Sequence, residues 1–290
     1  MRNWDDLRIF LAVAHAGRIA AAARALGVDA TTVGRRLARL EGAIGAPLFE
    51  TVAGERRLSE AGQALLHHAE TIDAAIAAAT EGEAAQGVAG HVRVSVAEGL
   101  ATHVLAPRLP GFAAAHPRIR LDLITASGLL DPSKREADIA VMLARPRNRQ
   151  LIAQRLVDYR LRLYATPGYL AAAGAPDTAA ALERHVLAGY VPEHLHAPEL
   201  DYLSEVHDGL SARLRSTSIN VQHRMIAAGA AIGILPDFIA ASDARLVPVL
   251  PHITLNRAFW LVMHADGQAA PRIQVVTSWL REAVEAPASL

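Results

Sequence analysis

Residues 19–44 read IAAAARALGVDATTVGRRLARLEGAI, and this stretch decides how the rest of the chain is interpreted. Its first eight residues are mostly Ala, the strongest helix former, and its larger apolar residues recur at helical spacing. Gly27 is typical of a helix C-terminus, and Asp29 is typical of the N-cap of a following helix. The stretch therefore predicts two short helices joined by a tight turn.

The second of these helices has two chemically different faces. One face is apolar and consists of Val33, Leu37, Leu40 and Ile44. The other carries hydroxyl and guanidinium groups, from Thr31, Thr32, Arg35, Arg36 and Arg39. Hydroxyls can bond phosphates or base edges, and Arg can pair with guanine or phosphate. The pattern predicts a helix-turn-helix that binds double-stranded DNA, and the alternative is an ordinary amphipathic helix with a solvated face.

Composition limits the class of protein. The 290 residues allow two domains, and the absence of Cys excludes disulfides, thiolate metal sites and Cys nucleophiles. No apolar run approaches the ~20 residues of a membrane span, and the N-terminus lacks a signal-peptide pattern, so we expect a cytoplasmic protein without membrane contact. The formal net charge is zero, but residues 1–58 hold nine Arg and six acids. That local excess suits a small DNA-binding head.

Two further elements follow the helix pair. Residues 48–59 predict a hairpin with a turn at Gly54, a wing whose Arg56 and Arg57 can reach phosphates; the alternative is a solvated hairpin. A long helix from Ser59 to about Glu83 then carries a narrow apolar seam, and this seam favours pairing with a second copy of the chain. Packing of the seam on the chain's own body is the alternative.

Beyond the hinge at 86–90, strands and helices alternate. The strands are expected near 91–96, 121–125, 138–142, 161–165, 186–190, 214–217, 232–235 and 259–264, and a last helix at 272–284. This order predicts an α/β body of two lobes around a cleft. The expected domains are a winged helix-turn-helix (1–58), a linker helix and hinge (59–90) and an effector-binding domain (91–290), with lobe I at 91–160 and 266–290 and lobe II at 161–265.

The chain resembles the LysR-type transcriptional regulators over essentially its whole length. The resemblance rests on DDLRIFLAVAHAGRIAAAARALGV, RRLARLEGAIGAPLFE, LSEAGQALL, YATPGYLAAAGAP and AAGAAIGILPDF. It implies an N-terminal winged helix-turn-helix, a dimerising linker helix and an effector domain similar to type 2 periplasmic binding proteins. It also implies self-association as a dimer or tetramer, promoter DNA as a partner and a small-molecule effector in the cleft.

Among the DNA contacts predicted above, the resemblance matches Arg35 and Arg36, and it implies further contact positions at Arg18, which could replace a lost phosphate contact, and Ala30. The chain departs from the family's usual residues at four positions in this region, namely Arg18, Ala30, Gly34 and Thr51.

Effector contacts are implied at the ends of strands and at the start of a helix in the second lobe. The residues are Glu98, Gly99, Ser127, Ala144, Arg145, Tyr190 and Asn220 to Gln222. Relatives commonly have Ser or Thr where this chain has Glu98. A carboxylate there would repel an anion and favour a cationic or hydroxylated ligand unless Arg145 neutralises it; the alternative is that Glu98 is simply exposed or paired with Arg.

Other classes of protein fit the sequence less well. The chain has no nucleophile elbow, Walker loop or dinucleotide fingerprint, so we expect no enzyme and no cofactor. Two His pairs, His67 with His68 and His194 with His196, lack a third ligand at metal spacing, so we expect no metal. A solute-binding protein would not carry the N-terminal head. A regulator that ignores ligands remains an alternative, and its cleft would be filled by side chains.

Overall fold

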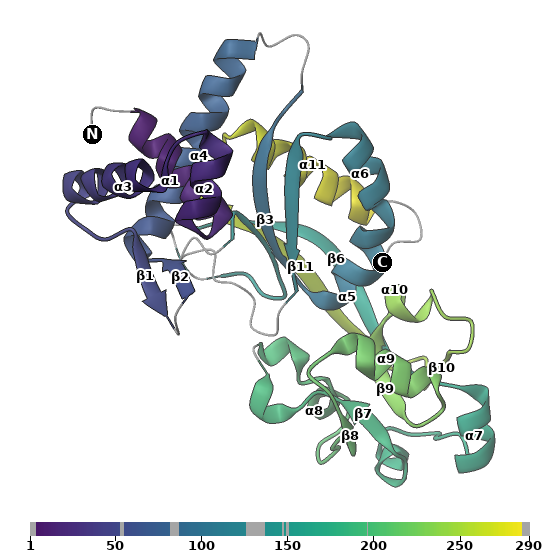
Figure 1. Cartoon of the computed structure of the whole chain (residues 1–290). Helices are drawn as coiled ribbons and strands as arrows, with labels where there is room; N and C mark the ends of the chain where they lie inside the picture. Colours follow the sequence, from purple (N-terminus) through teal and green to yellow (C-terminus); the bar gives the residue numbers. More distant parts are fainter. Residues whose placement is uncertain are drawn as a thin grey trace. The chain divides into compact units, whose positions relative to one another are not determined.

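The computed structural model describes residues 4–52, 55–81, 87–125, 137–146, 148, 151–195 and 197–285. The chain divides into two compact units, Met1–His91 and Val92–Leu290. Figure 1 shows the helical N-terminal unit in purple and blue and the sheet of the second unit in colours from blue, at β3, to yellow, at β11. Within the part that is described, no helix combines the length and apolarity needed to cross a membrane.

The N-terminal unit is a helix cluster with a two-stranded hairpin. Its elements are α1 (Trp4–Ala16), α2 (Ile19–Leu26), α3 (Ala30–Ile44), β1 (Phe49–Val52), β2 (Glu55–Leu58) and α4 (Glu60–Glu81). Gly27 is left-handed, with φ of 66°, and ends α2. Asp29 caps α3, because its side chain accepts a hydrogen bond from the Thr32 backbone N–H at 2.7 Å. The predicted helix-turn-helix and wing are confirmed, and the predicted turn at Gly54 lies outside the described residues.

The apolar faces of the helices form the core of this unit. Val33, Leu37 and Leu40 of α3 are buried against residues of α1, and Ala22 and Ala23 bury the face of α2. Ile44, predicted on the same apolar face, does not share this burial. Ile44 is 37% exposed, since it is the last residue of α3 and Gly45 turns the chain away.

The seam of α4 divides into two parts. Leu65 packs on the core shared with α1, and Ala69 is fully buried there. The prediction that the seam pairs with a second copy is therefore wrong for this first half, which packs on the chain's own body because the helix begins beside the wing and runs along α1. Further along, Ile72 and Ile76 are each 38% exposed.

The second unit is built on a nine-stranded sheet over the described residues. Its strands are β3 (Gly90–Val96), β4 (Ile119–Ile124), β5 (Ile139–Met142), β6 (Leu151–Ala165), β7 (Leu187–Gly189), β8 (Leu214–Arg215), β9 (Ile232–Pro236), β10 (Val247–Val249) and β11 (Leu255–His264). The order is β4-β3-β5-β11-β6-β9-β7-β8, and β10 pairs with β6. β3 is parallel to β5, and β7 is parallel to β8 and β9.

Two long antiparallel strands, β6 and β11, connect the two halves of this sheet (Figure 1). The C-terminal half of β11, Trp260 to Met263, pairs with β5, and the C-terminal end of β6 pairs with β9 and β10. Short strands are predicted from the sequence at 161–165 and 259–264. Both strands are longer, because each spans the sheet from one lobe to the other. The two-lobed α/β body is confirmed.

Helices and short helical turns cover the sheet. They are α5 (Glu98–Leu100), the π-helical turn η1 (Ala101–Leu105), the 3-10 turn η2 (Ala106–Arg108), α6 (Leu109–Ala115), α7 (Pro167–Ala173), η4 (Ala180–Arg184), η5 (Pro192–His194), η6 (Pro198–Leu200), α8 (Tyr202–Val206), α9 (Ile219–Ala227), α10 (Asp237–Ala240), η7 (Ala265–Gly267) and α11 (Pro271–Glu285). The last helix returns to the first lobe, where α11 contacts β6 and η1.

Candidate nucleic-acid interface and effector cavity

The outer face of α3 presents a small polar surface. Ala30, Thr31 and Arg35 are exposed, while Val33 and Leu37 on the opposite side are buried. Among the described residues Arg35 has no ion-pair partner. The Thr32 hydroxyl is turned toward the start of the helix and donates to Asp29 Oδ2 at 2.8 Å. Asp29 is therefore held by two hydrogen bonds from Thr32, which lower its pKa.

Two of the predicted contact residues are paired within the unit. Arg36 Nη1 lies 3.2 Å from Asp5 Oδ2, and Arg39 Nε donates to Asp6 Oδ2 at 2.8 Å with a second contact from its Nη2. Donation of these hydrogen bonds to the Asp6 carboxylate raises the pKa of Arg39. These two side chains join α3 to the first turn of α1, so their cationic heads are shared with carboxylates instead of being fully available to phosphates.

The remaining basic residues lie at the edges of this surface. Arg56 of the wing lies over the Phe49 ring, 5.5 Å from its centroid, and Arg57 is exposed. Arg18 is exposed at the N-cap position of α2, where its side chain makes no capping hydrogen bond. These residues flank the helix-turn-helix, and Arg35 lies within it.

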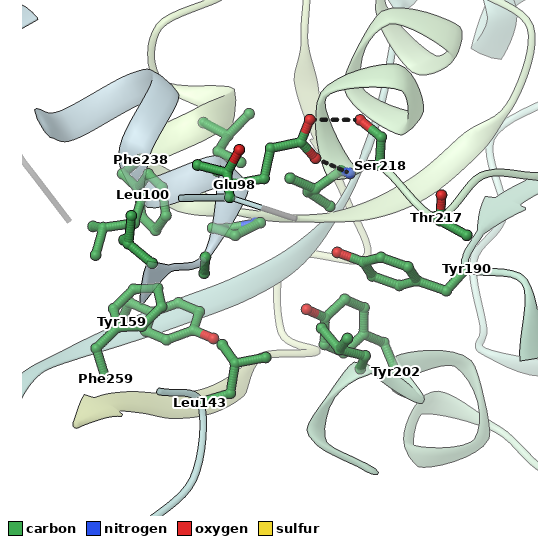
Figure 2. A pocket seen from close by; sticks show the side chains of 18 residues that line it. Glu98, Leu100, Leu143, Tyr159, Tyr190, Tyr202, Thr217, Ser218, Phe238 and Phe259 are labelled. Carbon is green, nitrogen blue, oxygen red and sulfur yellow. Dashed lines mark hydrogen bonds between the residues drawn. The ribbon is translucent and has the colours of Figure 1, made fainter. Parts of the chain in front are cut away.

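The second unit contains a cavity of about 190 Å³ between its lobes. Figure 2 shows its lining, which is apolar and aromatic with few polar groups. Its principal residues are Glu98, Gly99, Leu100, Thr125, Leu143, Tyr159, Tyr190, Tyr202, Thr217, Ser218, Ile219, Phe238 and Phe259. A concave, mostly apolar site with a few polar groups is typical of small-molecule binding.

Glu98 links the two lobes across this cavity. The Ser218 hydroxyl donates to Glu98 Oε1 at 2.9 Å, and the Ile219 backbone N–H donates to Glu98 Oε2 at 3.1 Å (Figure 2). Ser218 is also the N-cap of α9, so the carboxylate sits at the positive end of this helix. The position that could hold an anionic ligand is thus filled by the chain's own carboxylate.

Gly99 is required by close packing at the same point. A Cβ atom at this position would lie 2.8 Å from Cδ1 of Ile239 and 3.2 Å from Cγ2 of Ile219. Any larger residue would push these side chains apart. The absence of a side chain therefore lets α5 approach α9 and α10.

Three tyrosines form the polar part of the opposite wall. The Tyr159 ring stacks on Phe259, with centroids 4.3 Å apart, and Tyr190 meets Tyr202 edge-on at 5.9 Å. Their hydroxyl groups point toward the same space (Figure 2). Burial raises the pKa of all three hydroxyls, so each stays protonated at neutral pH.

A second set of hydrogen bonds joins the lobes beside the cavity. His103 Nε2 lies 3.1 Å from Asn220 Oδ1, and the Asn220 amide donates to the Thr102 hydroxyl at 2.9 Å. The Ser242 hydroxyl lies 3.3 Å from His103 Nδ1. Like the Glu98 contacts, these bonds join the first lobe to α9 and to the segment after α10.

The predicted effector contacts are only partly brought together. Glu98, Gly99 and Tyr190 line the cavity. Arg145 does not line it, but lies over the Trp260 ring at 5.6 Å, and Gln222 lines a neighbouring pocket, where it donates to the Ser216 carbonyl. Ser127 lies outside the described residues. Arg145 therefore does not neutralise Glu98.

Sequence reasoning missed several lining residues, above all Tyr159, Tyr202, Ser218 and Phe238. Ser218 could have been found, because it precedes the predicted start of a helix and Ser is a preferred N-cap. The aromatic residues gave no such signal, because their approach depends on how β6, α8 and α10 fold together.

One group among the described residues has the composition of a metal site. His15, Glu70 and His91, within the N-terminal unit, place their ligand atoms within 4.8 Å of one another. Burial would raise the pKa of Glu70, but interactions with His15, at 3.0 Å, and with His91, at 3.9 Å, outweigh it and hold the pKa at about 2. The hydrogen bond between His15 and Glu70 holds this group together.

The geometry so far defines a DNA-binding head attached to a two-lobed ligand-binding body, which is the plan of a ligand-responsive regulator. Comparison with known proteins makes this specific. Residues 4–63 match the model described as "Bacterial regulatory helix-turn-helix protein, lysR family", and residues 85–285 match the "LysR substrate binding domain". The chain belongs to the LysR family of bacterial transcriptional regulators, as the sequence motifs predicted.

Relatives align over almost the whole chain. The Mau operon transcriptional activator of Paracoccus denitrificans is 33% identical over 96% of this chain and 95% of its own length. The solved structure of CrgA, a LysR-type regulator from Neisseria meningitidis, is 27% identical, with a TM-score of 0.61 over 98% of this chain and all of that one. ArgP from Mycobacterium tuberculosis shares the fold, with a TM-score of 0.70 over 97% of both chains at 21% identity. This membership confirms a regulator of transcription and not an enzyme.

Proposed function

We propose that this regulator binds promoter DNA through the outer face of α3 and the wing, and that a small-molecule effector in the interlobe cavity changes that binding. The DNA contacts are assigned to Arg35, Thr31 and Ala30 on the helix, with Arg18, Arg56 and Arg57 at its edges. Arg35 carries the proposal, because it is exposed at the centre of this face and has no ion-pair partner among the described residues.

Arg36 and Arg39 have a different part in this proposal. They hold α3 against α1 through Asp5 and Asp6, which fixes the angle at which the helix is presented. Thr32 likewise supports the helix start through Asp29. These residues stay near the DNA as positioning residues, and any phosphate contact from them would compete with their internal partners.

The effector cavity supports the ligand-responsive part. It opens between lobes that are joined by Glu98 and by His103, so a ligand that alters these contacts alters the angle between the lobes. A cleft of a regulator that ignores ligands would be filled by side chains, whereas this one keeps about 190 Å³.

Assembly and location belong to the same proposal. We assign the exposed end of the α4 seam, Ile72 and Ile76, to contact with a second copy, giving a dimer or a tetramer of such dimers. Two heads would then bind two half-sites of one operator. The site of action would be the cytoplasm, where promoter DNA lies.

The test of the DNA assignment is fluorescence anisotropy with labelled DNA from the region upstream of the gene or its divergent neighbour. Arg35→Ala should weaken specific binding by about 1–3 kcal/mol, which is the usual discrimination of a bidentate Arg contact. If Arg35 contacts phosphate, the slope of log affinity against log salt concentration should also decrease in magnitude by about 1 in this variant.

Arg8→Ala is the matched control. Arg8 is exposed on α1 of the same unit, so its removal changes the charge equally but leaves α3 intact. Equal affinities of Arg35→Ala and the unaltered chain would refute the assignment of α3.

A further inference from the structure

We propose that the effector is a compact organic cation, an amine in its ammonium form, bound between the aromatic wall of the cavity and the Glu98 carboxylate. The inference rests on the proposed effector role of this cavity and adds the chemical class of the ligand. It starts from the charge of the lining. Among the described lining residues Glu98 is the sole Asp or Glu, and Lys, Arg and His are absent.

An anionic ligand would find no counter-charge in this cavity. The N-terminus of α9 is the feature that could bind a carboxylate, and Glu98 already occupies it through Ser218 and Ile219. A second carboxylate would be placed beside the first in a partly buried site, where like charges repel strongly. The contact of Glu98 with α9 therefore selects against anions.

A cation would use the remaining capacity of Glu98. A carboxylate has about four acceptor positions, and the two hydrogen bonds to α9 use one on each oxygen. Ammonium N–H groups can fill the others. The negative charge of Glu98 also reaches Tyr190 on the opposite wall, where it contributes to the raised pKa of the hydroxyl.

The aromatic wall suits the same chemistry. Five rings line the cavity, from Tyr159, Tyr190, Tyr202, Phe238 and Phe259. Faces of such rings attract ammonium groups, and recognition is strongest where water is excluded. The three buried hydroxyls stay protonated and uncharged, so they can accept ammonium hydrogen bonds through oxygen. An uncharged ligand would use the rings but would bring no positive charge to the Glu98 carboxylate.

The experiment measures the thermal unfolding midpoint of the full chain with three probes of similar shape, benzylammonium, benzyl alcohol and benzoate, at equal concentration and ionic strength. Binding to the native state raises the midpoint. Benzylammonium should raise it by about 2–4 °C, benzyl alcohol by less, and benzoate should leave it unchanged. A shift with benzoate or benzyl alcohol that equals or exceeds the ammonium shift overturns the inference, and so does the absence of an ammonium shift.

Glu98→Gln supplies the site-specific arm, because it removes the charge and keeps a carbonyl acceptor for α9. The ammonium shift should be lost in this variant and kept in Glu282→Gln, which removes an exposed carboxylate from α11. Retention of the shift in Glu98→Gln overturns the inference; if that variant does not fold, the probe series on the unaltered chain still decides. Stabilisation by benzoate alone would refute the ligand class but would still support the cavity as the effector site. DNA binding is tested separately by the anisotropy experiment.

Discussion

Gly34 is one of two glycines within α3, and it lies among the residues assigned to DNA. Nothing in the structure lies within 4 Å of a Cβ atom built at this position, so Ala fits without rearrangement. Gly34→Ala should stabilise the N-terminal unit by about 0.5–1 kcal/mol, because Ala loses less backbone entropy in a helix. Denaturant unfolding followed by helical circular dichroism would measure the change.

Gly62 is the matched contrast in the same unit. A Cβ there would lie 2.0 Å from the Leu48 backbone oxygen, so Gly62→Ala forces α4 away from the start of the wing and should destabilise the unit. If Gly34→Ala destabilised as much as Gly62→Ala, the open environment assigned to Gly34 would be incorrect.

At the residue scale the sequence predicted which side chains face inward on α3 better than it predicted their partners. The 3.6-residue period is sufficient to place Val33, Leu37 and Leu40 in the core. The pairing of Arg39 with Asp6 could not be derived in this way, because it depends on how α1 crosses α3. Ionic partners across two helices follow from packing, which a periodic pattern does not specify.

At the scale of elements, α9 joins the two lobes through its N-terminus and through a buried histidine. His223 is 5% exposed and lies 3.0 Å from Asp243 Oδ2, and its ring meets that of His103 edge-on at 5.6 Å. Burial lowers the pKa of both histidines below the ordinary 6.5, although Asp243 and Asn220 oppose the shift. Arg224 lowers both values further. The native state therefore favours two neutral imidazoles here.

The sign of the pH dependence follows from these lowered values. As the pH falls through 6.5, the two histidines become protonated in the unfolded chain but stay neutral in the folded chain, whose histidine pKa values are lower. Acid therefore favours the unfolded chain, and the free energy of unfolding decreases as the pH falls. The thermal unfolding midpoint of the second unit should decrease when the pH is lowered from about 7.5 to about 5.5, the range in which His titrates. The double variant His103→Gln, His223→Gln should show a flatter curve. A midpoint that rises with acid would contradict the burial of neutral histidines.

The elements themselves were largely predictable, and their lengths were less so. Alternating apolar residues located β3, and Gly27 with Asp29 located the turn of the helix-turn-helix. Strand β6 was expected only at 161–165 but begins at Leu151, because its first half pairs with β11 in the other lobe. Its burial pattern changes along its length, so no single period marks it.

At the scale of the whole molecule, self-association is expected to depend on the exposed end of α4. A charged residue at Ile72 or Ile76 would have to be desolvated in a helix pair, so Ile72→Asp combined with Ile76→Asp should dissociate the dimer. Analytical ultracentrifugation would measure the mass. Gln63→Asp, on the opposite side of the same helix, should leave the mass unchanged; an unchanged mass in the double variant would exclude this seam as the interface.

The cleft shows most clearly what the sequence could not supply. Motifs located the two lobes and placed Glu98 at the strand end, but its partners Ser218 and Ile219 lie 120 and 121 residues further along the chain. The same is true of the aromatic wall, which gathers residues from β6, α8, α10 and β11. Local pattern predicts elements, whereas the chemistry of the cavity arises only when the two lobes fold together.

The most direct test of the whole account is a nuclease footprint of the full chain on the region between its gene and the neighbouring divergent gene. The account predicts two protected half-sites about one helical turn, or a multiple of it, apart, as two paired heads require. Protection should be lost with Arg35→Ala and kept with Arg8→Ala. Two results would contradict this assignment. One is that the unaltered chain protects this region no better than unrelated DNA, and the other is that Arg35→Ala gives the same footprint as the unaltered chain.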